Sequence, residues 1–285
     1  MYWAVVCPEV DVKRLKMVLI ALLAIMIVIS LVREFAPNTV ETAMQASDPQ
    51  VRQRLFALVQ PVALKNCTLE RFGEGNDGGY LVCANLLNDV KAAYSYGISG
   101  YDQWGCDVST KLHVKLHQYD CFDTRQPACP GGDTVFHAEC IGDAARTEDG
   151  RLFDTMENQF AKNGDATKRS IIKMDVEGAE WDSLLHASDA TLQNIDQLAI
   201  ELHFINEERF VKTLERLHQF FYVAHLHFNN YSCSGGLEPF PAWAYELLLV
   251  NKRIGVVDTT QGRPPVSDLA ARNRPFWPDC QPTTP

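Results

Sequence analysis

Short apolar runs and amphipathic segments alternate along most of this chain. The apolar runs predict buried strands at residues 92–96, 116–120, 134–137, 170–174, 197–202, 221–228 and 244–251. Segments with apolar residues at helical spacing predict helices at 108–116, 153–163, 181–187 and 207–220. This alternation predicts an α/β fold with a doubly wound, mostly parallel, seven-stranded and Rossmann-like sheet.

The N-terminal region has a different pattern. Residues 17–32 are apolar except for one serine, and basic residues precede them. After them, the opposite charges of Arg33 and Glu34 cancel. The positive-inside rule then predicts a transmembrane signal anchor at 17–32, a short cytosolic head at 1–16 and a lumenal remainder, in the Golgi or the ER. The alternatives are a cleaved signal peptide, which would leave the protein secreted, and a buried helix. The remaining parts are a stem or peripheral helix at 33–64, the folded domain at 65–255 and an extended, proline-rich tail at 256–285.

Charge narrows the range of partners. The chain has 285 residues, enough for one α/β domain with appendages, and a formal net charge of −10. It lacks the lysine- and arginine-rich face with which proteins bind polyanions, so we expect no nucleic-acid partner. A small-molecule or glycan acceptor fits better, and the oligomeric state leaves no signal in the sequence.

Nine cysteines are present, and Cys7 alone precedes residue 33. The remaining even number suits disulfides in an oxidising compartment. Cys67 and Cys83 lie symmetrically about a glycine-rich turn between two strand-like segments, so a hairpin would place them opposite each other and predicts a Cys67–Cys83 bridge. Pairing of the other cysteines cannot be read. Of two Asn-x-Ser/Thr sequons, Asn66 is the predicted glycosylation site, and Asn230 is expected to lie in a binding site instead.

Polar residues gather at the predicted strand ends. The strand at 170–174 ends abruptly in Asp175-Val176-Glu177-Gly178, where open α/β sheets bind their ligands. The polar residues after later strands are Glu201, His203, His227, Asn229 and Asn230. We expect catalytic roles for Asp175, Glu177, His203 and His227, and substrate binding by Glu201, Asn229 and Asn230. The alternative for both histidines is a hydrogen-bonded core position.

Four ordered segments resemble the FkbM-type, methyltransferase-like protein 24 family of S-adenosylmethionine-dependent methyltransferases. They are the glycine-rich entry motif at 71–80, Tyr94-Ser95-Tyr96-Gly97-Ile98, Lys173-Met174-Asp175-Val176-Glu177-Gly178-Ala179-Glu180, and the segment 197–203. The resemblance covers residues 65–255. It implies a class I methyltransferase fold, S-adenosylmethionine as cofactor and O-methylation, with a sugar hydroxyl as the natural acceptor in the lumen.

The cofactor residues rest on the fold and on the resemblance together. A nucleotide needs a tight turn after the first strand, and Gly97-Ile98-Ser99-Gly100 provides one. The family pattern has an acid and a glycine at the positions of Ser95 and Ser99. Asp120, at the end of the second strand, is expected to bind the ribose, with Asp123 as the fallback.

The resemblance implies three further cofactor contacts. The segment around Glu139 and Asp143 would line the adenine pocket, with either acid on the base. Asp77, in the glycine-rich turn, would face the amino group of the methionine end, and Asp175 would border the cofactor.

Transfer of a methyl group to a hydroxyl requires loss of the hydroxyl proton. A histidine or carboxylate could remove it, or a divalent metal held by Asp175, His203 and His227 could stabilise the alkoxide. Two other functions compete with this one. A type II glycosyltransferase would want Asp-x-Asp, whereas Asp120 and Asp123 are one residue too far apart. A non-catalytic lumenal binding module would explain the altered glycine motif.

Overall fold

The computed structural model describes residues 48–262, 264, 267 and 269–281. The chain divides into two units, Met1–Ala46 and Ser47–Pro285. The predicted cytosolic head and the anchor at 17–32 therefore lie outside the described residues. Within the described ranges, every helix falls short of the length and apolar character that a bilayer crossing needs.

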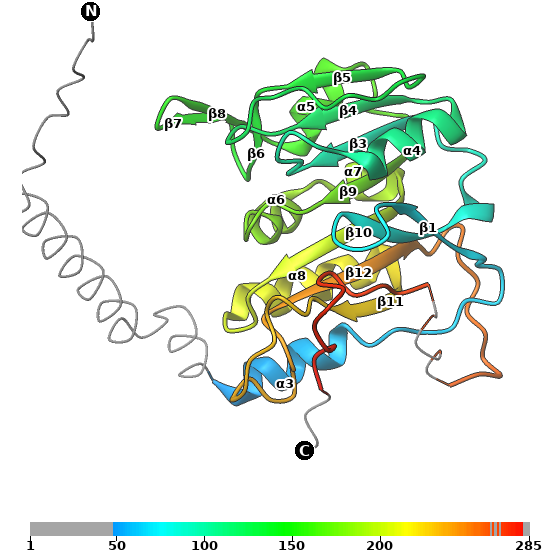
Figure 1. Cartoon of the computed structure of the whole chain (residues 1–285), viewed down its shortest axis with the longest axis vertical. Coiled ribbons are helices and arrows are strands. Elements are labelled where there is room, and N and C mark those ends of the chain that lie inside the picture. The colour runs from blue at the N-terminus through cyan, green and yellow to red at the C-terminus, as the bar shows by residue number, and fades with distance from the viewer. Residues whose placement is uncertain (1–47, 263, 265–266, 268, 282–285) are drawn as a thin grey trace, which may run out of the picture. The chain divides into compact units, whose positions relative to one another are not determined.

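A seven-stranded mixed sheet forms the centre of the second unit (Figure 1). Its strands, in spatial order, are β11 (Phe221–Phe228), β12 (Ala244–Asn251), β10 (Ile195–His203), β9 (Ser170–Met174), β3 (Ala92–Tyr96), β4 (Lys115–Tyr119) and β5 (Thr134–His137). Neighbours from β10 to β5 are parallel, whereas β12 is antiparallel to both β10 and β11. The predicted α/β class and the mostly parallel sheet are thus confirmed, and the central strands are buried throughout, as their apolar runs require.

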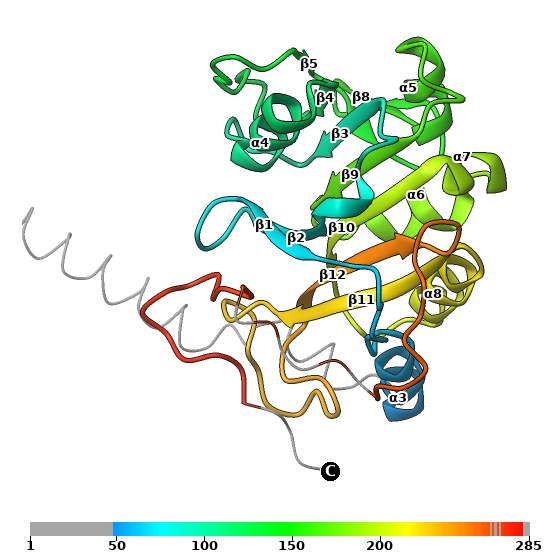
Figure 2. The same ribbon diagram turned by 90° about the vertical axis from the view of Figure 1, so that its right-hand side faces the viewer.

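Helices cover both faces of the sheet (Figure 2). One face carries α4 (Gln103–Leu112) and the hairpin of β1 (Leu69–Gly73) and β2 (Gly79–Cys83), followed by the short helix η1 (Ala84–Leu86). The other face carries α5 (Met156–Lys162), α6 (Glu180–His186), α7 (Asp189–Asn194) and α8 (Glu208–Phe220). Aromatic contacts seal the second face, with Tyr94 against Phe160 at 4.2 Å and Trp181 against Phe210 at 4.3 Å between ring centroids.

Two peripheral elements complete the unit. The helix α3 (Pro49–Leu58) begins with the side chain of Asp48 as its N-cap and packs on α8, so this part of 33–64 is a peripheral helix. A small sheet of β6 (Cys140–Ile141), β7 (Arg146–Glu148) and β8 (Arg151–Asp154) follows β5.

Four disulfides join the described cysteines. Cys67–Cys83 is the predicted hairpin bridge, with Cα atoms 5.0 Å apart. The others are Cys106–Cys129, Cys121–Cys140 and Cys233–Cys280. Cys121–Cys140 fastens the loop after β4 to β6, and Cys233–Cys280 fastens the tail to the loop after β11.

One helix was predicted in the wrong place. The structure starts α4 at Gln103, whereas the apolar spacing predicted residues 108–116. The side chain of Asp102 caps this helix by accepting a hydrogen bond from the backbone N–H of Gly105 at 2.8 Å. His113, in the left-handed conformation (φ 55°), ends it.

Candidate active site

The ends of β3 and β9 meet where the strand order reverses direction. From β3 the chain proceeds to β4 and β5 on one side, and later to β9 and β10 on the other. Such switch points are the ligand-binding crevices of open α/β sheets. Gly97 follows β3 with φ 71°, and a Cβ there would lie 1.6 Å from the carbonyl oxygen of Asp175. Only glycine therefore fits between these two strand ends.

Three pockets adjoin at this point, and Asp175 and Glu177 line all of them. Pocket A holds about 720 Å³ of space including its open mouth. Its wall includes Tyr96, Gly97, Tyr119, Asp120, Cys121, Phe122, Glu139, Cys140, Ile141 and Phe153. Pocket B lies under the hairpin turn and includes Asp77, Gly78, Ile98, Ser99, Tyr101 and Lys173. Pocket C includes Asp77, Glu201, His203, Asn229, Tyr231 and Trp243.

Asp120 lies on the wall of pocket A but is engaged with the backbone. Its Oδ2 accepts hydrogen bonds from the N–H groups of Ile98 and Ser99 at 3.0 and 2.8 Å. Its Oδ1 accepts from Phe122 and Asp123 at 2.8 and 2.9 Å. These four bonds occupy the lone-pair sites of the carboxylate and tie the loop after β3 to the loop after β4.

The two alternative acids for the cofactor lie outside the three pockets. Asp123 pairs with Arg125, whose guanidinium lowers the pKa of the Asp123 carboxyl to about 2. Asp143 pairs with Arg146 at 2.9 Å on the surface. Gly100 also lies outside these pockets, next to Arg125.

Aromatic rings form the floor of pocket A. Tyr96 stacks on Tyr119 with centroids 5.0 Å apart, and Tyr119 stacks on His137 at 4.4 Å. The Tyr96 hydroxyl is buried and has no hydrogen-bond partner among the described residues. Sequence reasoning missed both tyrosines as pocket residues, although their positions at the ends of two adjacent strands were a usable signal. Glu139, on the same pocket, forms an ion pair with Lys162 at 3.1 Å.

Lys173 supports the wall between pockets A and B from below. Its Nζ donates to the carbonyl oxygen of Gly97 at 2.6 Å and lies 3.7 Å from Oδ2 of Asp175. The buried ammonium thus holds the turn after β3 against the end of β9. Asp77 also lines pocket B. Desolvation raises the pKa of Asp77 above its ordinary value, and a hydrogen bond donated by Asn273 only partly offsets this rise.

His203 is the centre of pocket C. Its Nδ1 lies 2.8 Å from Oε1 of Glu180, a fully buried carboxylate. Its Nε2 faces Glu177, Glu201 and Asp175 at 3.4, 3.6 and 4.0 Å. Burial acts to lower the pKa of His203, but the bond to Glu180 and the surrounding carboxylates leave that pKa above its ordinary value.

Glu180 organises the turn after β9, a role that sequence reasoning missed. Its two carboxylate oxygens accept hydrogen bonds from the N–H groups of Val176 and Gly178. The turn holds Glu177 in the left-handed conformation (φ 56°), and Phe204, directly after His203, is also left-handed (φ 73°). Such strain in residues other than glycine is typical of functional sites. The third acid of the Asp-x-Glu-Gly-x-Glu motif was the available signal.

Glu201 carries the least favourable charge in pocket C. It faces Glu246 directly across β10 and β12, and both side chains are buried. Burial raises the pKa of Glu201 well above its ordinary value, and the charges of Asp175 and Glu246 raise it further. The amide of Asn229 donates a hydrogen bond to Glu201 at 2.7 Å, so this predicted pair does come together.

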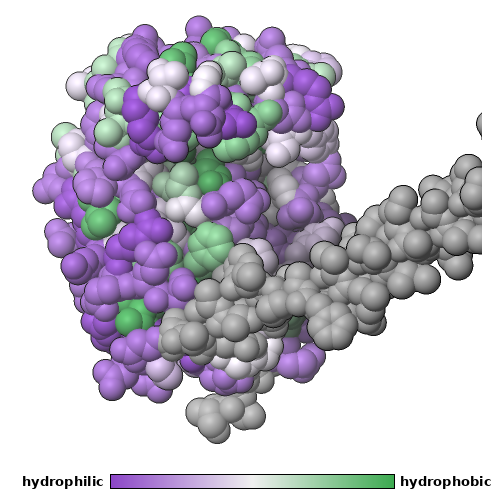
Figure 3. Space-filling model, turned by 90° about the vertical axis from the view of Figure 1, so that its left-hand side faces the viewer, coloured by the Kyte–Doolittle hydropathy of each residue, from purple (hydrophilic) through white to green (hydrophobic). Residues whose placement is uncertain are grey.

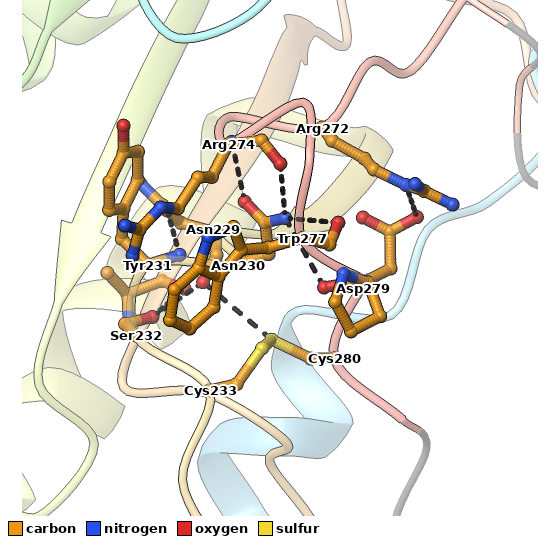
Figure 4. The surroundings of a disulfide bond; sticks show 12 residues. Asn229, Asn230, Tyr231, Ser232, Cys233, Arg272, Arg274, Trp277, Asp279 and Cys280 are labelled. Atoms are coloured by element: carbon orange, nitrogen blue, oxygen red, sulfur yellow. Dashed lines mark hydrogen bonds and ion pairs between the residues drawn. A yellow bond between two sulfur atoms is a disulfide. The ribbon is translucent and has the colours of Figure 1, made fainter.

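Two predicted site residues lie elsewhere. His227 lines none of pockets A, B and C, and its Nδ1 lies 3.5 Å from Glu246. Asn230 points its amide at the C-terminal tail (Figure 4). It donates to the carbonyl oxygens of Arg274, Trp277 and Pro278 and accepts from the N–H of Arg274 at 2.7 Å. Asn230 thus fastens the tail, and its buried, fully bonded amide has no room for a glycan in the fold.

The predicted glycosylation site is half-buried. The Asn66 amide donates to the carbonyl oxygen of Ile254 at 2.9 Å and accepts from the N–H of Val256 at 2.8 Å. Glycosylation at Asn66 stays a prediction.

The face of the molecule in Figure 3 carries mostly hydrophilic side chains, with small, separate hydrophobic patches.

No family model matches the chain. A comparison with curated proteins also finds no match. The site itself therefore carries the functional argument.

Proposed function

We propose that this protein is an S-adenosylmethionine-dependent methyltransferase that methylates a hydroxyl group of a glycan or a small secretory-pathway acceptor. The observation that carries the proposal is the meeting of three pockets at Asp175 and Glu177. A methyl donor and its acceptor must meet in this way, with the reacting atoms at a shared wall.

The cofactor fits pockets A and B. The adenosine would lie in pocket A against Tyr96 and Tyr119, and the methionine end would pass Gly97 into pocket B, where Asp77 would meet its amino group. The sheet order from β5 to β10 equals that of the first five strands of dinucleotide-binding folds. The sulfonium is a cation, so carboxylates at the shared wall favour its binding.

The ribose contact is the part of the proposal that the geometry changes. The four backbone bonds of Asp120 leave its carboxylate little capacity for ribose hydroxyls. Apart from Asp120 and the two acids at the shared wall, Asp175 and Glu177, the acid that lines pocket A is Glu139, and its partner is the exposed Lys162. We assign the polar contact with the nucleoside to Glu139.

The acceptor hydroxyl would lose its proton in pocket C. The acceptor oxygen would attack the methyl carbon, the carbon–sulfur bond would break with its electron pair remaining on sulfur, and the hydroxyl proton would pass to a base on pocket C, Asp175 or His203. Asp175 and His203 border pocket C at the shared wall, where a base or a cation must act. The four disulfides support an oxidising location, in the ER or Golgi lumen or outside the cell.

Calorimetric titration of the full-length, oxidised protein with S-adenosylmethionine tests this function. We expect micromolar binding that Glu139→Gln weakens at least tenfold. The matched control is Asp143→Asn, which removes a nearby acid outside the three pockets. A folded protein that gives no heat with S-adenosylmethionine refutes the proposal. Heat with nucleotide sugars instead would favour a glycosyltransferase, and silence with both would favour a binding module.

A further inference from the structure

We propose that Asp175, Glu177 and His203, supported by Glu201, form a binding site for a divalent first-row metal ion such as Mn²⁺. The proposal rests on the proposed function only for the role of the metal, because occupancy of the site can be measured without any methyl transfer.

The distances around His203 suit a shared cation better than hydrogen bonds. Its Nε2 lies 3.4 Å from Glu177, 3.6 Å from Glu201 and 4.0 Å from Asp175. An N–H···O hydrogen bond would bring these atoms to about 2.7–3.2 Å. Two ligands that each lie about 2.1 Å from a metal are about 3.0 Å apart at a right angle and about 3.4 Å apart in a tetrahedron. Small side-chain movements would therefore complete such a set.

The surroundings of the His203 imidazole also support a metal site. The side chain of His203 is 4% exposed, and its Nε2 makes no hydrogen bond with any described residue. Because Nδ1 donates to Glu180, a neutral ring presents the Nε2 lone pair to the carboxylates. A carboxylate–histidine pair of this kind is the usual support of a metal-binding histidine. Glu180 is itself held by the N–H groups of Val176 and Gly178, so the ring orientation is fixed before any metal arrives.

The charge balance of the pocket also favours a cation. Asp77, Asp175, Glu177 and Glu201 all border pocket C. The nearest ammonium, that of Lys173, approaches Asp175 at 3.7 Å but is committed to the carbonyl oxygen of Gly97. One imidazole among carboxylates suits Mn²⁺ or its first-row neighbours, whereas Ca²⁺ and Mg²⁺ prefer oxygen ligands alone.

The position of the site gives the metal a role in the proposed reaction. Asp175 and Glu177 line the cofactor pockets as well as pocket C. A metal between them and His203 would therefore hold the acceptor hydroxyl beside the sulfonium methyl group and make its proton easier to lose.

Titration of the full-length protein with Mn²⁺, followed by the loss of the free-ion electron paramagnetic resonance signal, tests the site. We expect one bound Mn²⁺, with Ca²⁺ and Mg²⁺ competing weakly. His203→Gln and Glu177→Gln should each weaken binding at least tenfold. The Glu177 side chain is 83% exposed, so the second variant keeps the fold even if the first does not.

His227→Gln is the matched control, because this histidine also faces a carboxylate but lies outside pocket C. Glu180→Gln tests positioning and should weaken Mn²⁺ binding 10- to 100-fold. Absence of Mn²⁺ binding by the wild type, or wild-type affinity in both ligand variants, would overturn the proposal. Titration with S-adenosylmethionine in the presence of a chelator separates this failure from that of the proposed function, since pocket A needs no metal.

Discussion

Asp120→Asn directly tests the loop-fastening role of this carboxylate. The wild-type side chain accepts four backbone hydrogen bonds, two on each oxygen. Asparagine keeps one acceptor oxygen and replaces the other with an NH₂ group, which must face two backbone N–H groups. The substitution therefore removes two of these bonds with almost no change in volume.

The expected cost follows from these two bonds. A hydrogen bond to a charged group contributes about 1.5–3 kcal/mol, so the loss of two gives about 3–6 kcal/mol. Because Asp120 is 8% exposed on a pocket wall, water can reach part of the group, and we expect the lower end, about 3 kcal/mol. Urea unfolding, followed by the fluorescence of buried Trp104 and Trp181, should show a lower midpoint with an unchanged slope.

Asp123→Asn is the control on the same loop. Its carboxylate pairs with the exposed Arg125 at the surface, so the unfolding midpoint should stay near that of the wild type. Wild-type stability of Asp120→Asn together with lost S-adenosylmethionine binding would refute our reasoning. Asp120 would then contact the ligand directly instead of fastening the loops.

Gly97→Ala should lower the free energy of unfolding by about 1–3 kcal/mol more than Gly164→Ala does. Both glycines have a positive φ, but only a Cβ at Gly97 would meet a backbone atom. Equal losses of stability in urea unfolding would contradict the close approach of β3 and β9. Burial lowers the pKa of His117 to about 4, despite the opposing charge of Asp165. As the pH falls, the unfolded chain takes up a proton before the folded chain does, so the free energy of unfolding should fall between pH 6.5 and pH 4. His117→Gln should remove about 3 kcal/mol of this pH dependence. Asn230→Ala should expose the segment 269–279 to proteases, while the disulfide with Cys233 keeps Cys280 attached. A cleavage pattern on non-reducing gels that matches the wild type would show that the Asn230 amide does not hold the tail.

The strands could be predicted from the sequence because each buried run is apolar and bounded by turn residues. Residues 92–96, 134–137, 170–174, 221–228 and 244–251 are strands with the predicted limits. The start of α4 could not be predicted from apolar spacing, because an aspartate side chain, Asp102, determines it. An acid at a strand end is compatible with either a ligand contact or a loop fastening, which is why the backbone bonds of Asp120 were not foreseen.

The insertion of β12 explains which site residues came together. The predicted site combined polar residues from the ends of several strands, as if all these ends lay close together. Because β12 lies between β10 and β11, the end of β11 is one strand further from β10, and Glu246 occupies the place between them. Asn229 still reaches Glu201, but His227 and Asn230 are displaced towards Glu246 and the tail.

The Cys121–Cys140 bridge has a consequence for when the protein can act. Both half-cystines line pocket A, so a covalent bond closes part of the wall against which a ligand would lie. In the reducing cytosol, the loop after β4 would lack this fastening, and the pocket would be open on that side. Ligand affinity would then appear only after the chain reaches an oxidising environment. Under the proposed function, the affinity for the cofactor would therefore depend on the redox state of this one bond as well as on the side chains of the pocket wall.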